Sequence, residues 1–249
     1  MRNPPWHRDE IILALDLYFH LVLGEIHARN PAIIALSDVL NNLPIFKIRP
    51  DEVKFRNPNG VALKLSNFLA LDPNYHGKGM QAFSRLDEKV FWEFLEQKQL
   101  LGKLASAIKS AVQNKELNEQ LYTIEEDVQQ YEVMEGQVIY RLHKHFERNA
   151  QIIKKKKTSE LALKGVLECE ACTFNFGKGY GKRGEGFIEC HHRIPLFELN
   201  ASAKTTIADL SLVCSNCHRM LHRGSKVLLV DDLKDDLKVT GLKYYFGKS

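Results

Sequence analysis

Apolar and polar positions alternate at helical spacing through the first part of the chain. Ile11, Leu15, Tyr18, Val22 and Ile26 recur at steps of three or four residues, which predicts one amphipathic helix over this stretch. Later segments repeat the pattern, so we expect residues 1–112 to form a compact and mainly helical domain.

Further helices are predicted in the same region. Asn30 and Pro31 are suited to the cap and the first turn of a helix over residues 31–42. Residues 61–71 predict another short helix, and residues 87–112 carry a long helical pattern. The turn-rich sequence between residues 48 and 82 separates these segments.

A polar, helix-compatible segment follows. Residues 113–150 contain no proline and one glycine, Gly136. We interpret residues 113–160 as a basic helical connector that leads to a C-terminal module over residues 161–249. The predicted fold class is therefore α+β, with strands confined to the C-terminal module.

The bulk composition, 44% apolar and 27% charged, is that of an ordinary soluble protein. No run of eighteen apolar residues is present, so we expect no membrane span. The first residues, MRNPPWHRDE, lack the apolar region of a signal peptide. We therefore expect a cytoplasmic protein, in which disulfides are uncommon and the five cysteines need another explanation.

Charge is distributed unevenly along the chain. Residues 140–226 carry 16 Lys and Arg against 8 Asp and Glu, a net charge of +8 within a chain whose total is +4. A basic segment of this kind is typical of polyanion binding. Charge alone equally fits a solvated basic surface, and both interpretations remain open at this stage.

Four of the five cysteines form two CxxC pairs, Cys169 with Cys172 and Cys214 with Cys217. Each two-residue spacer can fold into a knuckle that presents both sulfurs to one tetrahedral Zn²⁺. The 41 residues between the pairs make the predicted structural zinc a clamp around an inserted element. Cys190 is interpreted as a small buried strand residue.

Histidines lie inside and beside this clamp. His191 and His192 have apolar neighbours, as expected for a strand, while His218 and His222 are four residues apart and share one face of a helix. Histidines placed on a strand and a helix can converge on one divalent cation. Such a site leaves coordination positions open for phosphate oxygens.

Together these motifs resemble the HNH, or ββα-metal, nuclease family over residues 168–223. The matching segments are the first CxxC pair, the run YGKRGEGFIECHHRIPL and the run DLSLVCSNCHRMLH. In style the sequence is closest to restriction-type members grouped with the 5-methylcytosine-specific McrA enzymes. The resemblance covers a little over a fifth of the chain.

The resemblance implies a role for each matching residue. His191 and His218 would bind the catalytic cation (Mg²⁺, Mn²⁺ or Ni²⁺), with His222 a third ligand or a phosphate contact. His192 would be the general base that activates water. Asp209 stands where the family often has the Asn that holds this base, and a carboxylate there favours the protonated imidazole.

DNA contacts are predicted from charge and from loops. In the C-terminal half the candidates are Arg193, Arg219 and Arg223, with the run Lys154, Lys155, Lys156 and Lys157. In the N-terminal domain Arg56, Asn57 and Asn59 are candidates for reading DNA, and Trp6 or Tyr75 for stacking on a base. Each basic residue also fits an ordinary solvated surface, and the Asn-Pro and Asn-Gly pairs are also simple turn formers.

The sequence therefore predicts a metal-dependent endonuclease that cuts double-stranded DNA, with residues 1–112 as its target-recognition domain and a role in restriction of modified DNA. Pairing of two chains into a homodimer would allow both strands to be cut. The main alternative is a zinc-stabilised DNA-binding protein without catalysis. A third reading, an RNA-directed or mobile-element nuclease, lacks an obvious reverse-transcriptase or guide-binding region.

Overall fold

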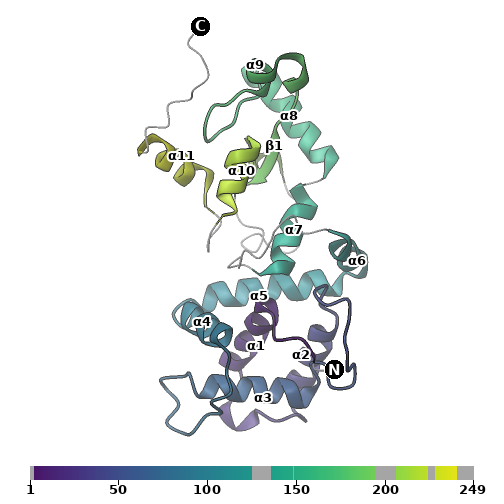
Figure 1. The fold of residues 1–249 in the computed structure, drawn as a ribbon, viewed down its shortest axis with the longest axis vertical. Coiled ribbons are helices and arrows are strands. Elements are labelled where there is room, and N and C mark those ends of the chain that lie inside the picture. Colours follow the sequence, from purple (N-terminus) through teal and green to yellow (C-terminus); the bar gives the residue numbers. More distant parts are fainter. Residues whose placement is uncertain (1–2, 125–135, 148, 194–205, 224–227, 240–249) are drawn as a thin grey trace. The chain divides into compact units, whose positions relative to one another are not determined.

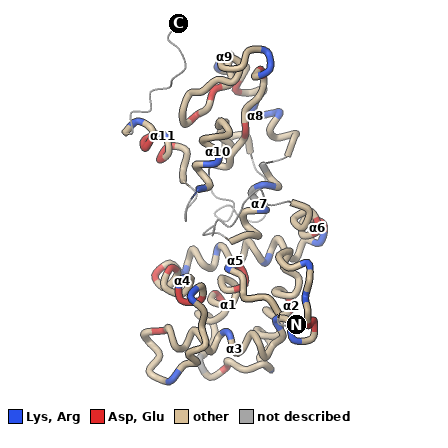
Figure 2. Tube along the Cα trace, in the orientation of Figure 1, with Lys and Arg blue, Asp and Glu red and all other residues tan. Residues whose placement is uncertain are grey.

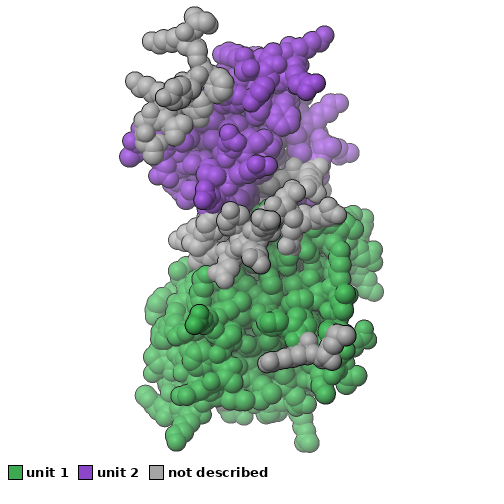
Figure 3. Space-filling view, viewed as in Figure 1, with its two compact units in different colours: residues 1–125, 135–141 green, residues 126–134, 142–249 purple. Residues whose placement is uncertain are grey.

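The computed structural model describes residues 3–124, 136–147, 149–193, 206–223 and 228–239, which are rich in helix and include one two-stranded sheet (Figure 1). The chain divides into two compact units (Figure 3). Unit 1 contains residues 1–125 and 135–141, and unit 2 contains residues 126–134 and 142–249. The predicted connector is thus shared between the units, and its residues 125–135 and 148 lie outside the described part of the chain.

The regular elements of unit 1 among its described residues are all helices. Its elements are α1 (Arg8–His20), η1 (Leu23–Glu25), α2 (Pro31–Asn41), α3 (Pro58–Leu69), α4 (Arg85–Phe94), α5 (Lys98–Gln113), α6 (Lys115–Thr123) and the start of α7 (Gln137–Glu147). Helix α1 packs against α2, α3, α4 and α5. Its residues 11–15 are fully buried, so this stretch is covered on all sides and not on one face alone, as the spacing predicted.

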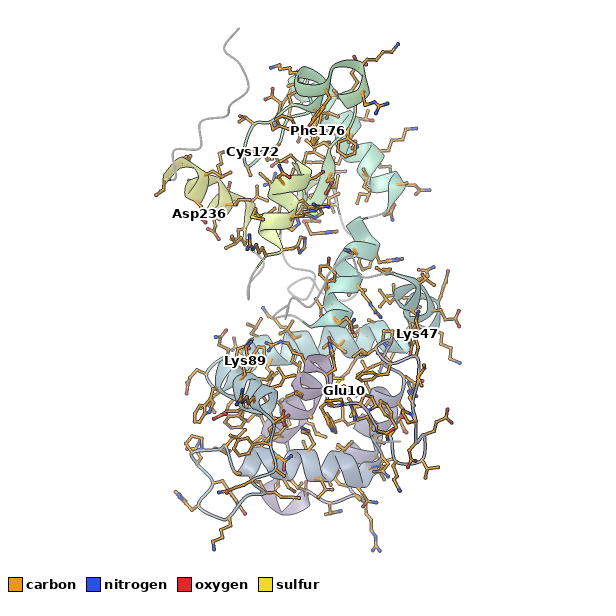
Figure 4. The ribbon with its side chains drawn as sticks, viewed as in Figure 1. Glu10, Lys47, Lys89, Cys172, Phe176 and Asp236 are labelled. Carbon is orange, nitrogen blue, oxygen red and sulfur yellow. The ribbon has the colours of Figure 1, made fainter. Side chains whose placement is uncertain are left out.

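Buried ion pairs accompany this apolar core. The guanidinium of Arg56 donates to Glu10 through Nε at 2.6 Å and Nη2 at 2.7 Å (Glu10 is labelled in Figure 4). The Nζ of Lys64 lies 2.7 and 2.8 Å from the two carboxylate oxygens of Asp87. The ring of Trp6 lies beneath both cations, at 4.7 Å from Arg56 and 4.9 Å from Lys64. The first pair joins α1 to the turn before α3, and the second joins α3 to α4.

Asp9 caps the beginning of α7. Its buried carboxylate accepts hydrogen bonds from the backbone N–H groups of Gln137 at 2.8 Å and Val138 at 3.1 Å. Gly136 precedes them with φ +86°, and a Cβ there would lie 2.3 Å from Asp9 Oδ1. Glycine is therefore required both by the backbone conformation and by the approach of the carboxylate. The first turn of α7 is fixed to unit 1 in this way.

Unit 2 combines short helices with a small sheet. Its elements are the end of α7, α8 (Ala150–Lys164), α9 (Phe176–Tyr180), η2 (Gly181–Gly184), β1 (Glu189–His192), η4 (Ile207–Asp209), β2 (Leu210–Val213), α10 (Ser215–Leu221) and α11 (Val230–Val239). Strands β1 and β2 are antiparallel, with His191 opposite Ser211 and His192 opposite Leu210. Helix α10 follows β2 after a single residue, so the order is strand, strand, helix.

The predicted helices are largely present, with shifted ends. Asn30 caps α2 by accepting from the N–H of Ala32 at 2.8 Å, as predicted. The first predicted helix was too long, because α1 ends at His20 and Val22 is 68% exposed. The pattern over residues 87–112 is divided between α4 and α5. Among the described residues no helix is both long and apolar enough to cross a membrane.

Candidate active site and metal centres

The four cysteines of the two CxxC pairs meet in unit 2. Their sulfur atoms all lie within 4.8 Å of one another, and each residue is buried. The sulfurs of Cys172 and Cys214 are 3.5 Å apart. This proximity places one thiol pair from the start of the module against one from the end of β2 (Cys172 is labelled in Figure 4).

Local backbone geometry presents these sulfurs. After the first pair the chain turns tightly, with the N–H of Thr173 donating to the carbonyl of Cys169 at 2.7 Å and Thr173 at φ +61°. At the second pair, Cys214 is the N-cap of α10 and its sulfur accepts from the N–H of Cys217 at 3.4 Å. An N–H donated to sulfur stabilises the thiolate form, which is the metal-binding form.

The four cysteines share their thiol protons, which shifts their pKa values in opposite directions. Hydrogen bonding from the neighbouring thiol of Cys169 lowers the pKa of Cys214. The same sharing raises the pKa of Cys217 and, mainly through Cys172, that of Cys169. Without a cation one thiolate is therefore favoured at the expense of its neighbours. Four buried sulfurs at this spacing fit a tetrahedral Zn²⁺, which removes that conflict.

Three histidines form a second cluster. Ring nitrogens of His191, His218 and His222 lie within 4.8 Å of one another. Their ring centroids are separated by 4.9 to 5.2 Å. His191 comes from β1, His218 from α10, and His222 caps the end of that helix. The strand and the helix thus bring together the three histidines that the sequence assigned to one cation, and imidazole ligands suit a divalent transition metal.

Glu189 orients His218 within this cluster. Its Oε2 lies 2.6 Å from Nδ1 of His218, and its Oε1 accepts from the hydroxyl of Ser215. The hydrogen bond from His218, followed by that from Ser215, lowers the pKa of Glu189 despite partial burial. A proton on Nδ1 leaves Nε2 as the ligand atom, an arrangement common among metal-binding histidines.

His192 lies outside the histidine cluster. Successive strand residues point to opposite faces of the sheet, so His192 faces away from His191. Its buried ring makes an edge contact with Phe146 at the end of α7, with centroids 6.5 Å apart. It is also close enough to Asp209 that the two groups interact electrostatically. His192, the predicted base, and His191, one of the predicted metal ligands, are thus neighbours in β1 whose side chains lie on opposite faces of the sheet.

Asp209 is held by its own turn. Its Oδ2 accepts from the N–H and the hydroxyl of Thr206, both at 2.7 Å, and these bonds lower its pKa. Its carbonyl accepts from the N–H of Arg193 at 2.8 Å. Asp209 therefore secures the backbone directly after His192, in addition to its Coulomb interaction with the ring.

Glu170, the residue after Cys169, connects the first CxxC pair to the sheet. Its backbone N–H donates to Leu212 at 2.8 Å and its Oε1 accepts from the N–H of Leu212 at 2.8 Å. Its Oε2 accepts from the guanidinium of Arg193. The Nζ of Lys156 lies 3.9 Å from its Oε1. The carboxylate thus extends the hydrogen bonding of β2 and fixes two of the basic residues predicted to contact DNA.

The remaining predicted DNA contacts divide by exposure. Lys154 and Lys155 on α8, Arg219 on α10 and Arg223 after it are exposed. Lys156 is buried, with its Nζ 2.9 Å from Glu160, so we correct its assignment as a DNA contact. Lys157 donates to the carbonyl of Gly186 at 2.9 Å.

The candidates in unit 1 have structural environments. Arg56 is 6% exposed and its guanidinium also donates to the carbonyls of Pro4 and Pro5, so its assignment as a DNA contact is corrected as well. Asn57 caps α3 by accepting from the N–H of Gly60 at 2.9 Å. Asn59, in the first turn of α3, is exposed. Residues 57–60, predicted as a turn or loop, are the N-cap and first turn of α3, and the pattern also missed the burial of Arg56.

Sequence reasoning also missed Glu189, Ser215 and Glu170. A signal existed for Glu189, which precedes His191 by two residues and therefore shares its face of β1. Ser211 lies opposite His191 in the register and is fully buried, a position that only the strand pairing reveals. Residues 194–196 of the motif YGKRGEGFIECHHRIPL lie outside the described part of the chain.

Comparison with known proteins bears on the same segment. No curated protein and no solved structure matches the chain. Residues 169–224, which contain both clusters, match the family model described as HNH endonuclease, so this segment is supported as an HNH domain with a nuclease-type, DNA-cleaving function.

Proposed function

We propose that this protein is a metal-dependent endonuclease of the HNH type that hydrolyses double-stranded DNA. The observation that carries the proposal is the convergence of His191, His218 and His222 inside the segment that matches the HNH family. The strand, strand, helix order around them fits the ββα-metal fold that the resemblance implies. The thiol cluster would hold structural zinc beside this site.

The proposed chemistry assigns one task to each residue. A divalent cation bound by the histidine cluster would supply Lewis-acid stabilisation of the phosphate. Glu189 holds the ring of His218 so that its Nε2 faces the cluster. His192 would take the proton of the attacking water, and Asp209 would favour the imidazolium that results. Because β1 ends at His192, a phosphodiester at this strand end is within reach of residues on both faces.

Exposed basic residues would position the DNA backbone. Lys154, Lys155, Arg219 and Arg223 are the exposed members of the predicted set, and phosphate contacts need charge more than fixed geometry. Blue on the α8 segment of the tube in Figure 2 marks its lysines, since this helix contains no arginine. Weakening by salt is the expected property of such contacts.

The target-recognition and restriction roles form a further part of the proposal. Unit 1 is a separate compact unit with a core of its own, and it carries Asn59 exposed at the start of α3. We infer that unit 1 selects the DNA and that modified DNA, as for McrA-like enzymes, is the preferred target. Cytoplasmic location and homodimerisation belong to the same proposal, and cell fractionation and sedimentation analysis test them.

Cleavage of plasmid DNA tests the proposal. Plasmid in unmodified, cytosine-methylated, hydroxymethylated and phosphorothioated forms is incubated with Mg²⁺, Mn²⁺ or Ni²⁺ and either wild type or His192→Ala. We expect wild type to cut at least one form and His192→Ala to cut roughly 100-fold or more slowly. His76→Ala, which changes an exposed histidine of unit 1, is the matched control. Absence of cutting by wild type on every form would overturn the nuclease assignment.

A second candidate function is DNA binding without catalysis. It is favoured by Asp209, which replaces the usual Asn and whose carboxylate is engaged by Thr206. Under this alternative the wild-type protein retards plasmid DNA in a gel without cutting it, at every metal tested. The cleavage experiment therefore separates the two functions.

A further inference from the structure

A segment between the first CxxC pair and β1 exposes aromatic rings. Residues 174–187, here called the aromatic insert, contain α9 and η2. Phe176 is at its centre, stacked on Tyr180 with centroids 5.9 Å apart and planes inclined by 21° (Phe176 is labelled in Figure 4). The edge of Phe187 contacts the same ring at 4.7 Å, and Phe174 contacts it at 4.8 Å.

The four aromatic rings of the insert differ in how far they are buried. Phe174 and Phe176 pack against the core that contains the thiol cluster. Tyr180 and Phe187, in contrast, are 61% and 50% exposed. A short insert needs no large exposed aromatic side chains for its own stability, and such residues together often mark a binding surface.

The backbone of the insert is held in place. Asn175 caps α9 by accepting from the N–H of Lys178 at 2.8 Å. A Cβ at Gly184 would lie 1.9 Å from the carbonyl oxygen of Phe176, so the two halves of the insert are in direct backbone contact. Lys157 of α8 donates to Gly186 at the other end. The exposed rings are therefore presented by an ordered element, which lowers the entropic cost of binding.

The insert is also basic. It contains Lys178, Lys182 and Arg183 against a single acidic residue, Glu185. Lys178 is paired with Glu168 at 3.3 Å. Within the described part of the chain, Lys182 and Arg183 are exposed and make no hydrogen bond or ion pair with protein groups. Figure 2 shows blue, the colour of Lys and Arg, on the tube beside α9.

We propose that the aromatic insert is a stacking platform for unpaired bases of single-stranded DNA. Aromatic rings beside basic side chains are the combination by which proteins hold single strands, because every base offers a flat face and every nucleotide a phosphate. A fully paired duplex conceals those faces in its base stack, so the charges alone would contact it. The exposed rings thus favour unpaired DNA over a duplex.

This inference rests on the proposed nuclease function and narrows its substrate. DNA with an unpaired stretch, such as a flap, gap or bubble, would bind the insert and the basic residues of unit 2 together. The preferred substrate class is accordingly a duplex with single-stranded character, rather than a continuous duplex.

Equilibrium binding without added divalent metal tests the inference apart from cleavage. Fluorescence anisotropy is measured with a labelled single-stranded DNA, the matching duplex and a single-stranded RNA of the same sequence. Tyr180→Ala should raise the Kd for single-stranded DNA roughly 10-fold, and Tyr180→Phe should leave it within about twofold. Trp92→Ala, which removes a ring that is 51% exposed in unit 1, is the matched control and should have no effect.

A spectroscopic readout separates stacking from a general loss of structure. In Tyr180→Trp, the new indole should be quenched on addition of single-stranded DNA and much less by the duplex. Any of three results would overturn the inference. They are equal affinity of wild type and Tyr180→Ala for single-stranded DNA, an equal loss of affinity for single strand and duplex in Tyr180→Ala, and tighter binding of RNA than of single-stranded DNA. Loss of binding in Tyr180→Ala in a protein that never cuts DNA would instead contradict only the proposed nuclease function.

Discussion

The two units of this protein are stabilised in different ways. The largest fully buried side chains of the described residues, among them Phe55, Phe68, Phe91 and Phe94, all belong to unit 1. In unit 2 the main core cluster contains the four thiol-cluster cysteines beside a few small or medium apolar residues. Unit 1 therefore buries an extensive apolar core, whereas unit 2 assembles around a cysteine cluster that could hold a metal.

This difference teaches why the candidate site is in unit 2. Short elements such as β1, β2 and α10 bury too little apolar surface to fix a site by packing alone. Zinc bound to the thiol cluster would hold the end of β2 and the start of α10, because Cys214 and Cys217 lie there. His218 directly follows Cys217, so the same zinc would also help to position the histidine cluster. Both the folding and the proposed catalysis of unit 2 would then depend on bound metal. The folding of unit 1 would not.

The strongest test of the comparison removes one sulfur. Cys214→Ser should lose bound zinc and unfold unit 2 while unit 1 stays folded, because structural zinc contributes on the order of 10 kcal/mol or more to small domains. Elemental analysis and hydrogen exchange resolved along the chain measure the two effects. Cys190→Ala, which changes a buried cysteine outside the thiol cluster, should keep its zinc. Retained zinc and unchanged protection in Cys214→Ser would remove the basis of the comparison.

The reciprocal change acts on unit 1. Arg56→Ala leaves the buried carboxylate of Glu10 without the guanidinium that accompanies it, which costs about 3–5 kcal/mol. Urea unfolding followed by the fluorescence of Trp6 and Trp92, which both lie in unit 1, should show this loss, with the zinc content unchanged. Arg29→Ala, at an exposed position, serves as control and should change stability by less than about 0.5 kcal/mol. A similarly small effect of Arg56→Ala would argue against a structural role for the pair.

A smaller change sharpens the description of the histidine cluster. Glu189→Gln should weaken binding of Ni²⁺ to the zinc-loaded protein by about 10- to 100-fold, the usual range for outer-sphere carboxylates of metal sites. Calorimetric titration measures the affinity, and Glu185→Gln, at an exposed position in the aromatic insert, is the control. Equal affinity in the two variants would show that Glu189 does not position His218.

The smallest expected effect concerns α8 and pH. Hydrogen bonds from Lys164 and Lys156 lower the pKa of Glu160 below its ordinary value of 4.5. Their stabilising contribution is complete above pH 4.5 and is lost as pH falls through the lowered pKa. Glu160→Gln should therefore destabilise unit 2 by less than about 1 kcal/mol at pH 7, and the difference from wild type should shrink in acid. A difference that grows towards low pH would contradict this sign.

Much of the site could be predicted from the sequence, because its ligands occur at short, regular spacings. The two CxxC pairs and the His218–His222 interval identified residues that the structure brings together. Strand alternation could also have identified Glu189, through its two-residue offset from His191. Each of these signals is a spacing of two to four residues, and the local helix or strand geometry alone decides which side chains such a spacing brings to one face.

The remainder depends on partners that are distant in sequence. Arg56 looked like a loop residue available to DNA, yet its partner Glu10 lies 46 residues earlier. Lys156 looked like one of four equivalent lysines. Its partner Glu160 is a local i,i+4 neighbour on α8, whereas Glu170, which also lies close to it, belongs to the first CxxC pair and could not be inferred from spacing. The break between α1 and η1 likewise follows no local signal that we identify, since Val22 continues the apolar spacing and is nevertheless exposed.

The central claim is that unit 2 holds two separate metal centres, one structural and one catalytic. Its most direct test measures bound zinc and plasmid cleavage in the same preparation of His218→Ala. We expect one zinc per chain, as in wild type, and a cleavage rate reduced by at least about 100-fold, because a direct ligand matters more than an outer-sphere one. Full cleavage by a zinc-loaded His218→Ala protein would contradict the account.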